Sequence, residues 1–253
     1  MQIEKLIQEK IFEIESTEHV RILHAVESGS RAWGFASPNS DYDVRFIYVR
    51  KQQDYLKLNS VSDVINWQLD EVFDINGWDL KKALCLLKNS NPTVFEWNLS
   101  PIVYKTTDFW QNHQEIINHY FSCKAGVHHY LNTAKTSYQK FLTSNQIKLK
   151  KYFYVLRPIL ACHWILKYKK PAPMLFSELV NSMLEYEMKP LIQDLLDKKM
   201  NNSESSTSNQ IPELNNYILR NLNLLEKQAN SLPDDKNHDW NALNQMFLDN
   251  FLE

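Results

Sequence analysis

Glycine is scarce in this sequence, and its placement is uneven. Only four of the 253 residues are glycine, and two of them, Gly29 and Gly34, fall in the stretch from Glu27 to Arg45. Glycine is the residue that adopts positive φ angles, or lets a ligand approach the main chain, at little steric cost. A chain with so little glycine therefore predicts a special backbone requirement in the loop between residues 27 and 45.

Cysteine is also scarce, and long hydrophobic runs are absent. Cys85, Cys123 and Cys162 are odd in number, far apart and without a CxxC pair, which argues against a disulfide framework and against a zinc site. No apolar run approaches the length that spans a bilayer. The stretch Met1–Glu18 alternates charged residues with Ile and Leu, unlike the apolar core of a signal peptide. We expect a soluble, cytoplasmic protein with no membrane partner.

The hydrophobic pattern divides the chain into a mixed front part and a helical back part. We expect a helix over residues 3–14 and another after the capping residue Asp79. We also expect four strands, over residues 20–26, 44–49, 64–69 and 71–75. The last two strands would meet at Asp70 and end at Gly77. Helical periodicity dominates after residue 108, over 110–121, 125–142, 148–168, 176–199, 212–229 and 239–251. The polar stretch Asn201–Asn209 predicts a hinge or disordered loop. The pattern predicts two domains, residues 1–105 and 106–253.

Two aspartates follow the glycine-bearing loop at alternate positions. Asp41 and Asp43 lead into the predicted strand 44–49, and side chains two residues apart on a strand share a face about 7 Å apart. Two carboxylates at that spacing repel unless a cation lies between them, and oxygen-only ligands suit Mg²⁺ or Mn²⁺. Upstream, Gly29 and Ser30 offer backbone N–H groups and a hydroxyl to phosphate oxygens. A phosphate-binding turn beside a metal-binding pair predicts nucleotide chemistry.

These motifs carry a family resemblance. The stretch GSRAWGFASPNSDYDVR resembles the signature of the DNA polymerase β-type nucleotidyltransferase superfamily, a Gly-Ser loop followed by Asp-x-Asp. More narrowly, GSRAWG with SDYDVR, GWDLKKAL, SNPTVFEW and SPIVY is similar to the predicted nucleotidyltransferase family associated with RNA repair operons. The blocks run in one order over residues 24–105, with a weaker echo in KKYFYVLRPILACHWI. The resemblance implies an α+β protein, in which a nucleotidyltransferase fold with a mixed sheet flanked by helices precedes an all-helical domain.

The resemblance also implies a reaction and residue roles. An acceptor hydroxyl would attack the α-phosphate of an NTP in line and release pyrophosphate, while Asp41 and Asp43 hold two Mg²⁺ or Mn²⁺ ions. Ser30, beside Gly29, would hold the β- and γ-phosphates. Arg31 or Arg45 would add a fork of hydrogen-bond donors to them.

The superfamily usually supplies a third carboxylate from a later strand, and two aspartates compete for that role. Asp74 stands between Phe73 and Ile75, which would face the core and leave Asp74 on the opposite side of the strand. Asp79 precedes a helix, where capping is the commoner role of an aspartate. We favour Asp74 as the third metal ligand and keep Asp79 as the alternative.

Acidic residues are absent from residues 116–177, although the whole chain has a net charge of −2 and ten Lys and Arg residues fall in that segment. Basic residues interleaved with aromatics fit the guidance of a triphosphate or RNA. They equally fit a solvated lysine-rich surface over an aromatic core. Lys151 and Arg157 lie in the block that echoes the family, and an arginine in apolar company normally has a partner. That partner is either a core carboxylate or a nucleotide phosphate, and the second would make Lys151 and Arg157 nucleotide-binding residues.

Three functions share these features. A nucleotidyltransferase acting on an RNA end is the leading hypothesis. The Gly-Ser, Asp-x-Asp site also resembles that of antitoxins that transfer AMP to a hydroxyl of a protein partner. Those antitoxins tend to be little more than the equivalent of this chain's front half, whereas this chain also carries a helical half over residues 106–253. The third function is a catalytically inactive nucleotide- or RNA-binding module, against which the intact Asp41 and Asp43 argue.

Overall fold

The computed structural model describes residues 2–144, 146–201 and 207–251. The chain forms two compact units. The first contains the residues up to 32, residues 40–121 and the residues from 237 onward, and the second contains residues 33–39 and 122–236. The sequence placed a boundary near residue 105, whereas the chain passes into the second unit after residue 121 and returns at residue 237. The last predicted helix therefore belongs to the same unit as the predicted strands.

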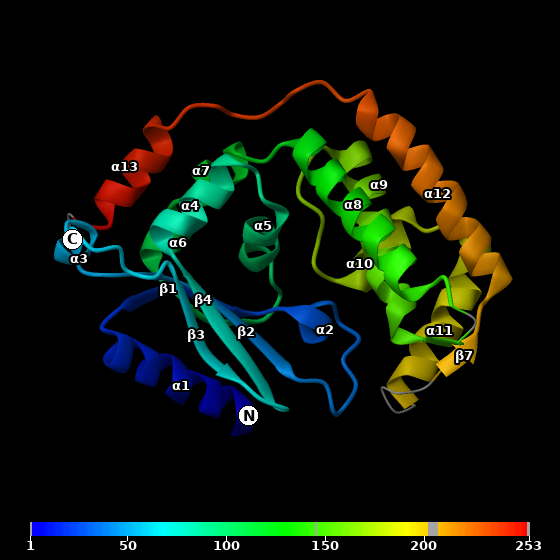
Figure 1. The fold of residues 1–253 in the computed structure, drawn as a ribbon, viewed down its shortest axis with the longest axis horizontal. Helices are drawn as coiled ribbons and strands as arrows, with labels where there is room; N and C mark the ends of the chain where they lie inside the picture. Colours follow the sequence, from blue (N-terminus) through cyan, green and yellow to red (C-terminus); the bar gives the residue numbers. More distant parts are fainter. Residues whose placement is uncertain (1, 145, 202–206, 252–253) are drawn as a thin grey trace. The chain divides into compact units, whose positions relative to one another are not determined.

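The first unit is built around a five-stranded mixed sheet (Figure 1). The strand order is β3-β4-β2-β1-β5, with bounds β1 Arg21–Glu27, β2 Tyr42–Val49, β3 Val64–Leu69, β4 Phe73–Asp79 and β5 Val103–Thr106. β2 and β4 run parallel, and the other neighbouring strands run antiparallel. Asp70 closes the β3–β4 hairpin, because its side chain accepts hydrogen bonds from the N–H groups of Val72 and Phe73 at 2.8 and 2.7 Å. The four predicted strands are confirmed, and β5 is an addition.

Helices cover both faces of this sheet (Figure 1). One face, with Val44, Phe46 and Tyr48 of β2, packs against α1 (Gln2–Glu18), which confirms the first predicted helix. On the other face, Ile47 and Val49 pack with several helices. These helices are α4 (Leu80–Lys88), α5 (Pro92–Asn98), α6 (Asp108–Asn112), α7 (Gln114–His119) and α13 (Asn241–Asp249). Two short helices, α2 (Gly29–Ala32) and α3 (Gln52–Tyr55), lie before and after β2.

Gly77 lies inside β4, so the expectation that it ends the strand was wrong. It pairs with Phe46 in the parallel register, and a Cβ at this position would lie 2.2 Å from the Phe46 ring. Glycine therefore makes room for an aromatic ring inside the sheet instead of turning the chain. The strand continues to Asp79, whose side chain accepts a hydrogen bond from the N–H of Lys81 at 2.8 Å and caps α4, as the sequence predicted.

The second unit is mainly helical, which confirms the α+β class. Its helices are α8 (Cys123–Phe141), α9 (Lys150–Tyr168), α10 (Phe176–Met183), the 3₁₀ helix η1 (Tyr186–Met188), α11 (Lys189–Asn201) and α12 (Pro212–Asn230). The predicted helix over 176–199 is interrupted, because Leu184 has extended backbone with ψ 136°. Of the predicted hinge, residues 202–206 lie outside the described residues, and β7 (Thr207–Asn209) pairs with β6 (Gln146–Lys148). Over the described parts of the chain, no helix is long and apolar enough to cross a membrane.

Candidate functional site

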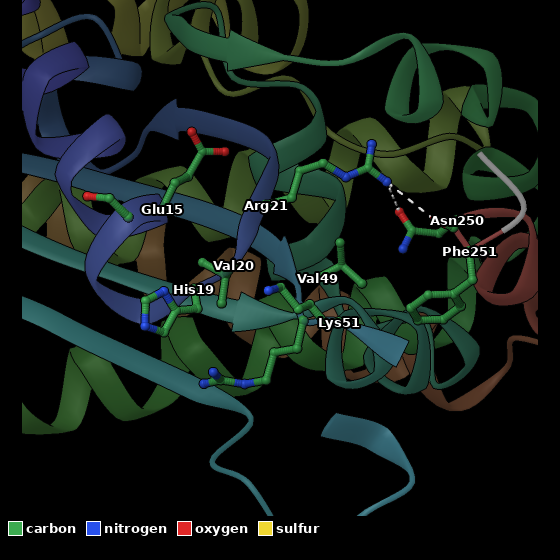
Figure 2. Close-up of a pocket in the computed structure, with 10 residues that line it drawn as sticks. Glu15, His19, Val20, Arg21, Val49, Lys51, Asn250 and Phe251 are labelled. Carbon is green, nitrogen blue, oxygen red and sulfur yellow. Dashed lines mark hydrogen bonds between the residues drawn. The ribbon is translucent and has the colours of Figure 1, made fainter. Parts of the chain in front are cut away.

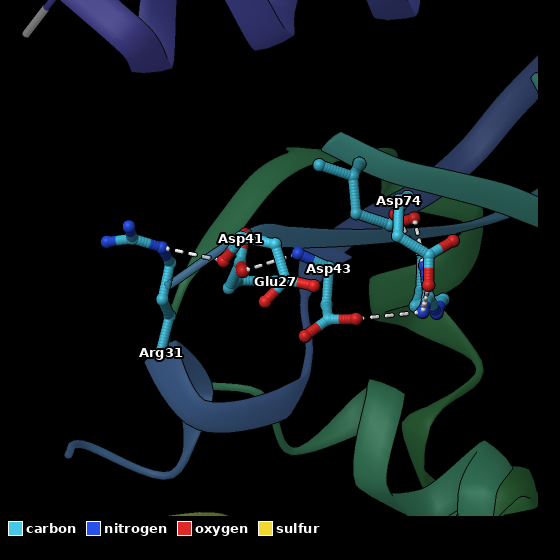
Figure 3. Close-up of polar contacts among 7 residues, drawn as sticks. Glu27, Arg31, Asp41, Asp43 and Asp74 are labelled. Atoms are coloured by element: carbon cyan, nitrogen blue, oxygen red, sulfur yellow. Dashed lines mark hydrogen bonds and ion pairs between the residues drawn. The ribbon is translucent and has the colours of Figure 1, made fainter. Parts of the chain in front are cut away.

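Asp43 and Asp74 lie side by side on β2 and β4, where they are partners in the parallel register. Arg45, two residues after Asp43 on the same face of β2, donates from Nη2 to Asp43 Oδ1 at 3.0 Å and to Asp74 Oδ2 at 2.6 Å. Its Nη1 also donates to the main-chain oxygen of Asp74 at 2.6 Å. One guanidinium thus joins both carboxylates and offsets their mutual repulsion (Figure 3).

Asp41 lies just before β2, and its side chain is exposed. Arg31 donates from Nε to the main-chain oxygen of Asp41 at 2.9 Å (Figure 3). Its Nη2 donates to the main-chain oxygen of Ser40 at 2.5 Å. Its guanidinium also stacks on the ring of Tyr42 at 3.7 Å. Arg31 therefore braces the turn that leads into β2, and its proposed contact with a triphosphate stays a prediction.

Gly29 explains how the loop approaches the carboxylates. Its φ angle is +56°, and a Cβ there would lie 1.9 Å from Asp43 Oδ2. The N–H of Ser28 donates to the main-chain oxygen of Asp43 at 2.8 Å, which ties the loop to β2. Gly29 and the half-buried Ser30 begin the short helix α2 beside this contact. The positive φ angle of Gly29 is the special backbone conformation that the sequence predicted for this loop. Together with the missing Cβ, it lets the loop lie close to the Asp43 carboxylate.

Glu27 is a site residue to which the sequence analysis gave no role. Its side chain is fully buried at the end of β1, where Oε1 accepts the N–H of Asp43 at 2.8 Å and Oε2 accepts the hydroxyl of Tyr104. Burial raises the pKa of Glu27 to about 7, against the lowering effect of its hydrogen bonds. The available signal was an acidic residue at the end of an apolar strand, two residues before Gly29. Glu27 fixes the main chain of Asp43.

The local electrostatics favour a cation at Asp43. Burial raises the pKa of Asp43 to about 6, and the negative charges of Asp41 and Asp74 act in the same direction, while Arg45 opposes them. A partly buried carboxylate in a cluster of carboxylates gains most from a nearby positive charge. In the structure Arg45 provides that charge.

Asp79 has a different environment from Asp74. Five positions separate the two residues on β4, so their side chains lie on opposite faces of the strand. The Asp79 carboxylate is 3% exposed, caps α4, and accepts the hydroxyl of Tyr55 at 2.8 Å. The structure therefore brings Asp74, and not Asp79, to Asp43.

The described residues contain no group of three or more His, Cys, Asp and Glu side chains arranged to hold a metal ion. At Asp43 and Asp74, Arg45 takes up one oxygen of each carboxylate. The donor set still suits Mg²⁺ or Mn²⁺, because carboxylate oxygens are hard ligands, and the missing Cβ of Gly29 lets the Asp43 carboxylate lie against the loop. Binding of an ion there requires Arg45 to release at least one carboxylate.

Lys151 lies on α9 of the second unit, among aromatic side chains of that unit. Its Nζ lies 4.1 Å from the centroid of the Phe141 ring and 4.5 Å from that of Tyr154. The acid-free segment also has partners from elsewhere in this unit, since Lys135 of α8 pairs with Glu226 of α12 at 2.5 Å. The proposed nucleotide contact of Lys151 stays a prediction.

The middle of the motif loop, residues 33–39, belongs to the second unit, where it lies near Arg157. The main-chain oxygen of Trp33 accepts the N–H of Phe176 at 2.9 Å. Arg157 is 3% exposed, its guanidinium carbon lies 4.8 Å from the centroid of the Trp33 ring, and its Nη2 lies 3.4 Å from the sulfur of Met174. Aromatic and thioether contacts therefore surround this arginine, and its nucleotide contact stays a prediction.

Comparisons with known proteins agree with the motifs. The model of the RNA repair pathway DNA polymerase beta family matches residues 3–249. The uncharacterized protein YcgL of Bacillus subtilis (strain 168) is 39% identical over 244 residues, which cover 96% of this chain and 94% of that protein. The family match includes the Gly-Ser loop, Asp41, Asp43 and Asp74, and it continues through the helical unit into α13. On this evidence, the chain belongs to the RNA repair pathway DNA polymerase beta family.

Proposed function

We propose that this protein is a metal-dependent nucleotidyltransferase that transfers a nucleoside monophosphate from an NTP to an acceptor hydroxyl. The observation that carries the proposal is the pairing of Asp43 with Asp74 on parallel strands, directly beside the Cβ-free Gly29. Asp41 lies two residues before Asp43 and adds a third carboxylate to the same region. Membership in a DNA polymerase beta family supports this reaction class.

Asp41, Asp43 and Asp74 are the residues that would hold two Mg²⁺ or Mn²⁺ ions. Such ions, when bound, lower the pKa of the acceptor hydroxyl and stabilise charge on the attacking and leaving oxygens. Asp79 is less suited, because its carboxylate is already used by the cap of α4 and by Tyr55.

The residues of the chain supply position and charge. Glu27 fixes the main chain of Asp43, and Arg45 keeps Asp43 and Asp74 together while no ion is bound. Ser30 would contact the β- and γ-phosphates from the start of α2. Positioning and charge neutralisation account for most of the rate enhancement in phosphoryl-type transfer.

An RNA end is the acceptor that we favour. The family is named for an RNA repair pathway. In addition, the helical unit contains the acid-free segment 116–177 with ten Lys and Arg residues, and positive charge of this kind attracts a polyphosphate backbone.

A transfer assay tests this proposal. The protein is incubated with each α-³²P-labelled NTP, Mg²⁺ or Mn²⁺, and RNAs with free 3′-hydroxyl ends, beside an Asp43→Asn variant. Label on RNA with the wild type, and not with the variant, is the expected result. Label on protein would mean that the protein is a nucleotidyltransferase whose acceptor is a protein hydroxyl and not an RNA end. No transfer to any acceptor by the folded wild type would overturn the proposal.

A further inference from the structure

A cavity of about 690 Å³ lies in the first unit, at the far end of β2 from the carboxylates (Figure 2). Its walls come from the end of α1 and the start of β1, from Val49, Arg50 and Lys51, and from Asn250 and Phe251 after α13. Val49 lies six residues after Asp43 on β2, which corresponds to roughly 20 Å at the rise of a strand. The cavity is therefore separate from the site of Asp43 and Asp74.

The charged groups that line this cavity are mostly positive. They are Arg21, Arg50 and Lys51, together with one acid, Glu15. Glu15 is already engaged, because its Oε1 accepts the N–H of Ile22 at 2.7 Å and the ammonium of Lys105 at 2.6 Å. Among the described residues that line the cavity there are therefore three cations and one carboxylate, and that carboxylate is paired with Lys105.

The hydrogen-bond partners of Arg21 and Arg50 are neutral groups, and Arg50 also interacts electrostatically with Asp54 and Asp79. Arg21 donates from Nη2 to the Asn250 side chain at 2.6 Å and to its main-chain oxygen at 3.4 Å (Figure 2). Arg50 makes two long hydrogen bonds, to the main-chain oxygens of Glu18 at 3.5 Å and Ser62 at 3.4 Å. Its Nε is buried without a hydrogen-bond partner among the described residues. A buried donor without a partner costs free energy, and a ligand in the cavity would meet the outer nitrogens of Arg50 and not this buried Nε.

Lys51 adds a cation that is free to reorient. Its side chain is exposed, and within the described parts of the chain its ammonium makes no hydrogen bond or ion pair. Val20 and Val49 supply apolar surface in the same cavity, and Phe251 supplies an aromatic ring. The lining thus combines cations with an apolar wall, as sites for small phosphorylated ligands do.

A second cavity, of about 610 Å³, shows the contrast. Arg50 also lines it, with Lys57, Lys81 and Lys82, but Asp54, Asp63 and Asp79 line it too. Lys57 pairs with Asp54 at 2.6 Å, and Lys82 pairs with Asp63 at 3.0 Å. Three carboxylates offset four cations there, so of these two cavities the first has the larger excess of positive charge among its lining residues.

We propose that the first cavity binds a nucleoside phosphate of mononucleotide size, with the phosphate held by Arg21, Arg50 and Lys51 and the base against Phe251. Its volume falls within the range of small-molecule sites and admits about one nucleotide. This site is independent of nucleotidyl transfer, because it uses none of the carboxylates and needs no metal ion.

Calorimetric titration of the full-length chain with AMP tests the proposal. EDTA is present throughout, so that the carboxylates at Asp43 stay metal-free and repel an anion. We expect saturable binding of one AMP per chain by the wild type. Arg50→Gln and Lys51→Gln should each weaken it about tenfold or more, the usual effect of losing a charged hydrogen bond. Lys51→Gln changes an exposed side chain, so its effect does not depend on the stability of the fold.

Two controls have the same loss of charge elsewhere on the surface. Arg220→Gln and Lys5→Gln should bind AMP as the wild type does, because neither residue lines the cavity. The proposal is overturned if the wild type shows no saturable binding, if Arg50→Gln and Lys51→Gln bind as well as the wild type, or if adenosine binds as tightly as AMP.

Discussion

Replacement of Gly29 by alanine tests how tightly the loop is fitted to Asp43. The Cβ would lie 1.9 Å from Asp43 Oδ2 and 2.8 Å from its Cγ, but 3.4 Å from its Cβ. The Asp43 carboxylate must therefore move, whereas its Cβ can stay. The backbone at residue 29 has φ +56°, which is also unfavourable for alanine.

These two effects have separate magnitudes. A non-glycine residue in the left-handed region costs about 1–2 kcal/mol. Displacement of the Asp43 carboxylate breaks its ion pair with Arg45, which costs about a further 1.5–3 kcal/mol. In an Asp43→Ala background only the first cost applies. We therefore expect Gly29→Ala and Asp43→Ala to be coupled by about 1.5–3 kcal/mol, the cost of the lost ion pair.

Urea unfolding of the wild type, both single variants and the double variant, in EDTA, measures this coupling. Gly34→Ala is the matched control, since Gly34 also has a positive φ, +83°, but its added Cβ would meet Leu175 and not Asp43. We expect Gly34→Ala and Asp43→Ala to add within about 0.5 kcal/mol. Equally additive effects of Gly29→Ala and Asp43→Ala would refute the inferred fit between loop and carboxylate.

Three further predictions concern His24, Arg45 and Asp79. Burial lowers the pKa of His24 from 6.5 to about 4, so the folded state holds it neutral and loses stability as the pH falls from 6.5 to 4. Relative to His24→Gln, the wild type should lose about 3 kcal/mol of unfolding free energy over that range, at 1.36 kcal/mol per pH unit, and equal pH profiles would contradict this. Arg45→Gln should bind Mn²⁺ about tenfold more tightly in the absence of nucleotide, because the ion no longer displaces a guanidinium; unchanged or weaker binding in paramagnetic resonance titrations would be evidence against it. Asp79→Ala should cost about 2 kcal/mol in urea unfolding, since it removes the cap of α4 and the acceptor of Tyr55, and no loss would argue against the capping role.

Local patterns made part of the site predictable. The alternation of buried and half-buried residues along β4 follows from the strand period, so the sequence placed Asp74 opposite Phe73 and Ile75 correctly. The cap formed by Asp79 was predictable for the same reason, because a capping side chain bonds to a neighbour in the sequence.

Features that depend on long-range pairing were not predictable. Arg45 was expected to bind phosphate, but the parallel pairing of β2 with β4 places Asp74 within its reach. In the sequence, Glu27 is only an acidic residue at the end of a strand. Its role in the site depends on Tyr104 of β5 and on the N–H of Asp43, which both donate hydrogen bonds to its carboxylate in the folded protein.

The assignment of residues 33–39 to the helical unit has the same origin. It rests on contacts with distant segments, such as the hydrogen bond from Phe176 to Trp33. No periodicity in residues 27–45 encodes these contacts.

The most direct test of the central claim is a count of bound Mn²⁺ ions by paramagnetic resonance, in the presence of an NTP analogue with a methylene α–β bridge. The wild type is expected to bind two ions per chain. Asp43→Asn and Asp74→Asn should each lose at least one of them, while Asp79→Ala should keep both. The same count in the wild type, Asp43→Asn and Asp74→Asn would contradict the assignment of these carboxylates to the metal site.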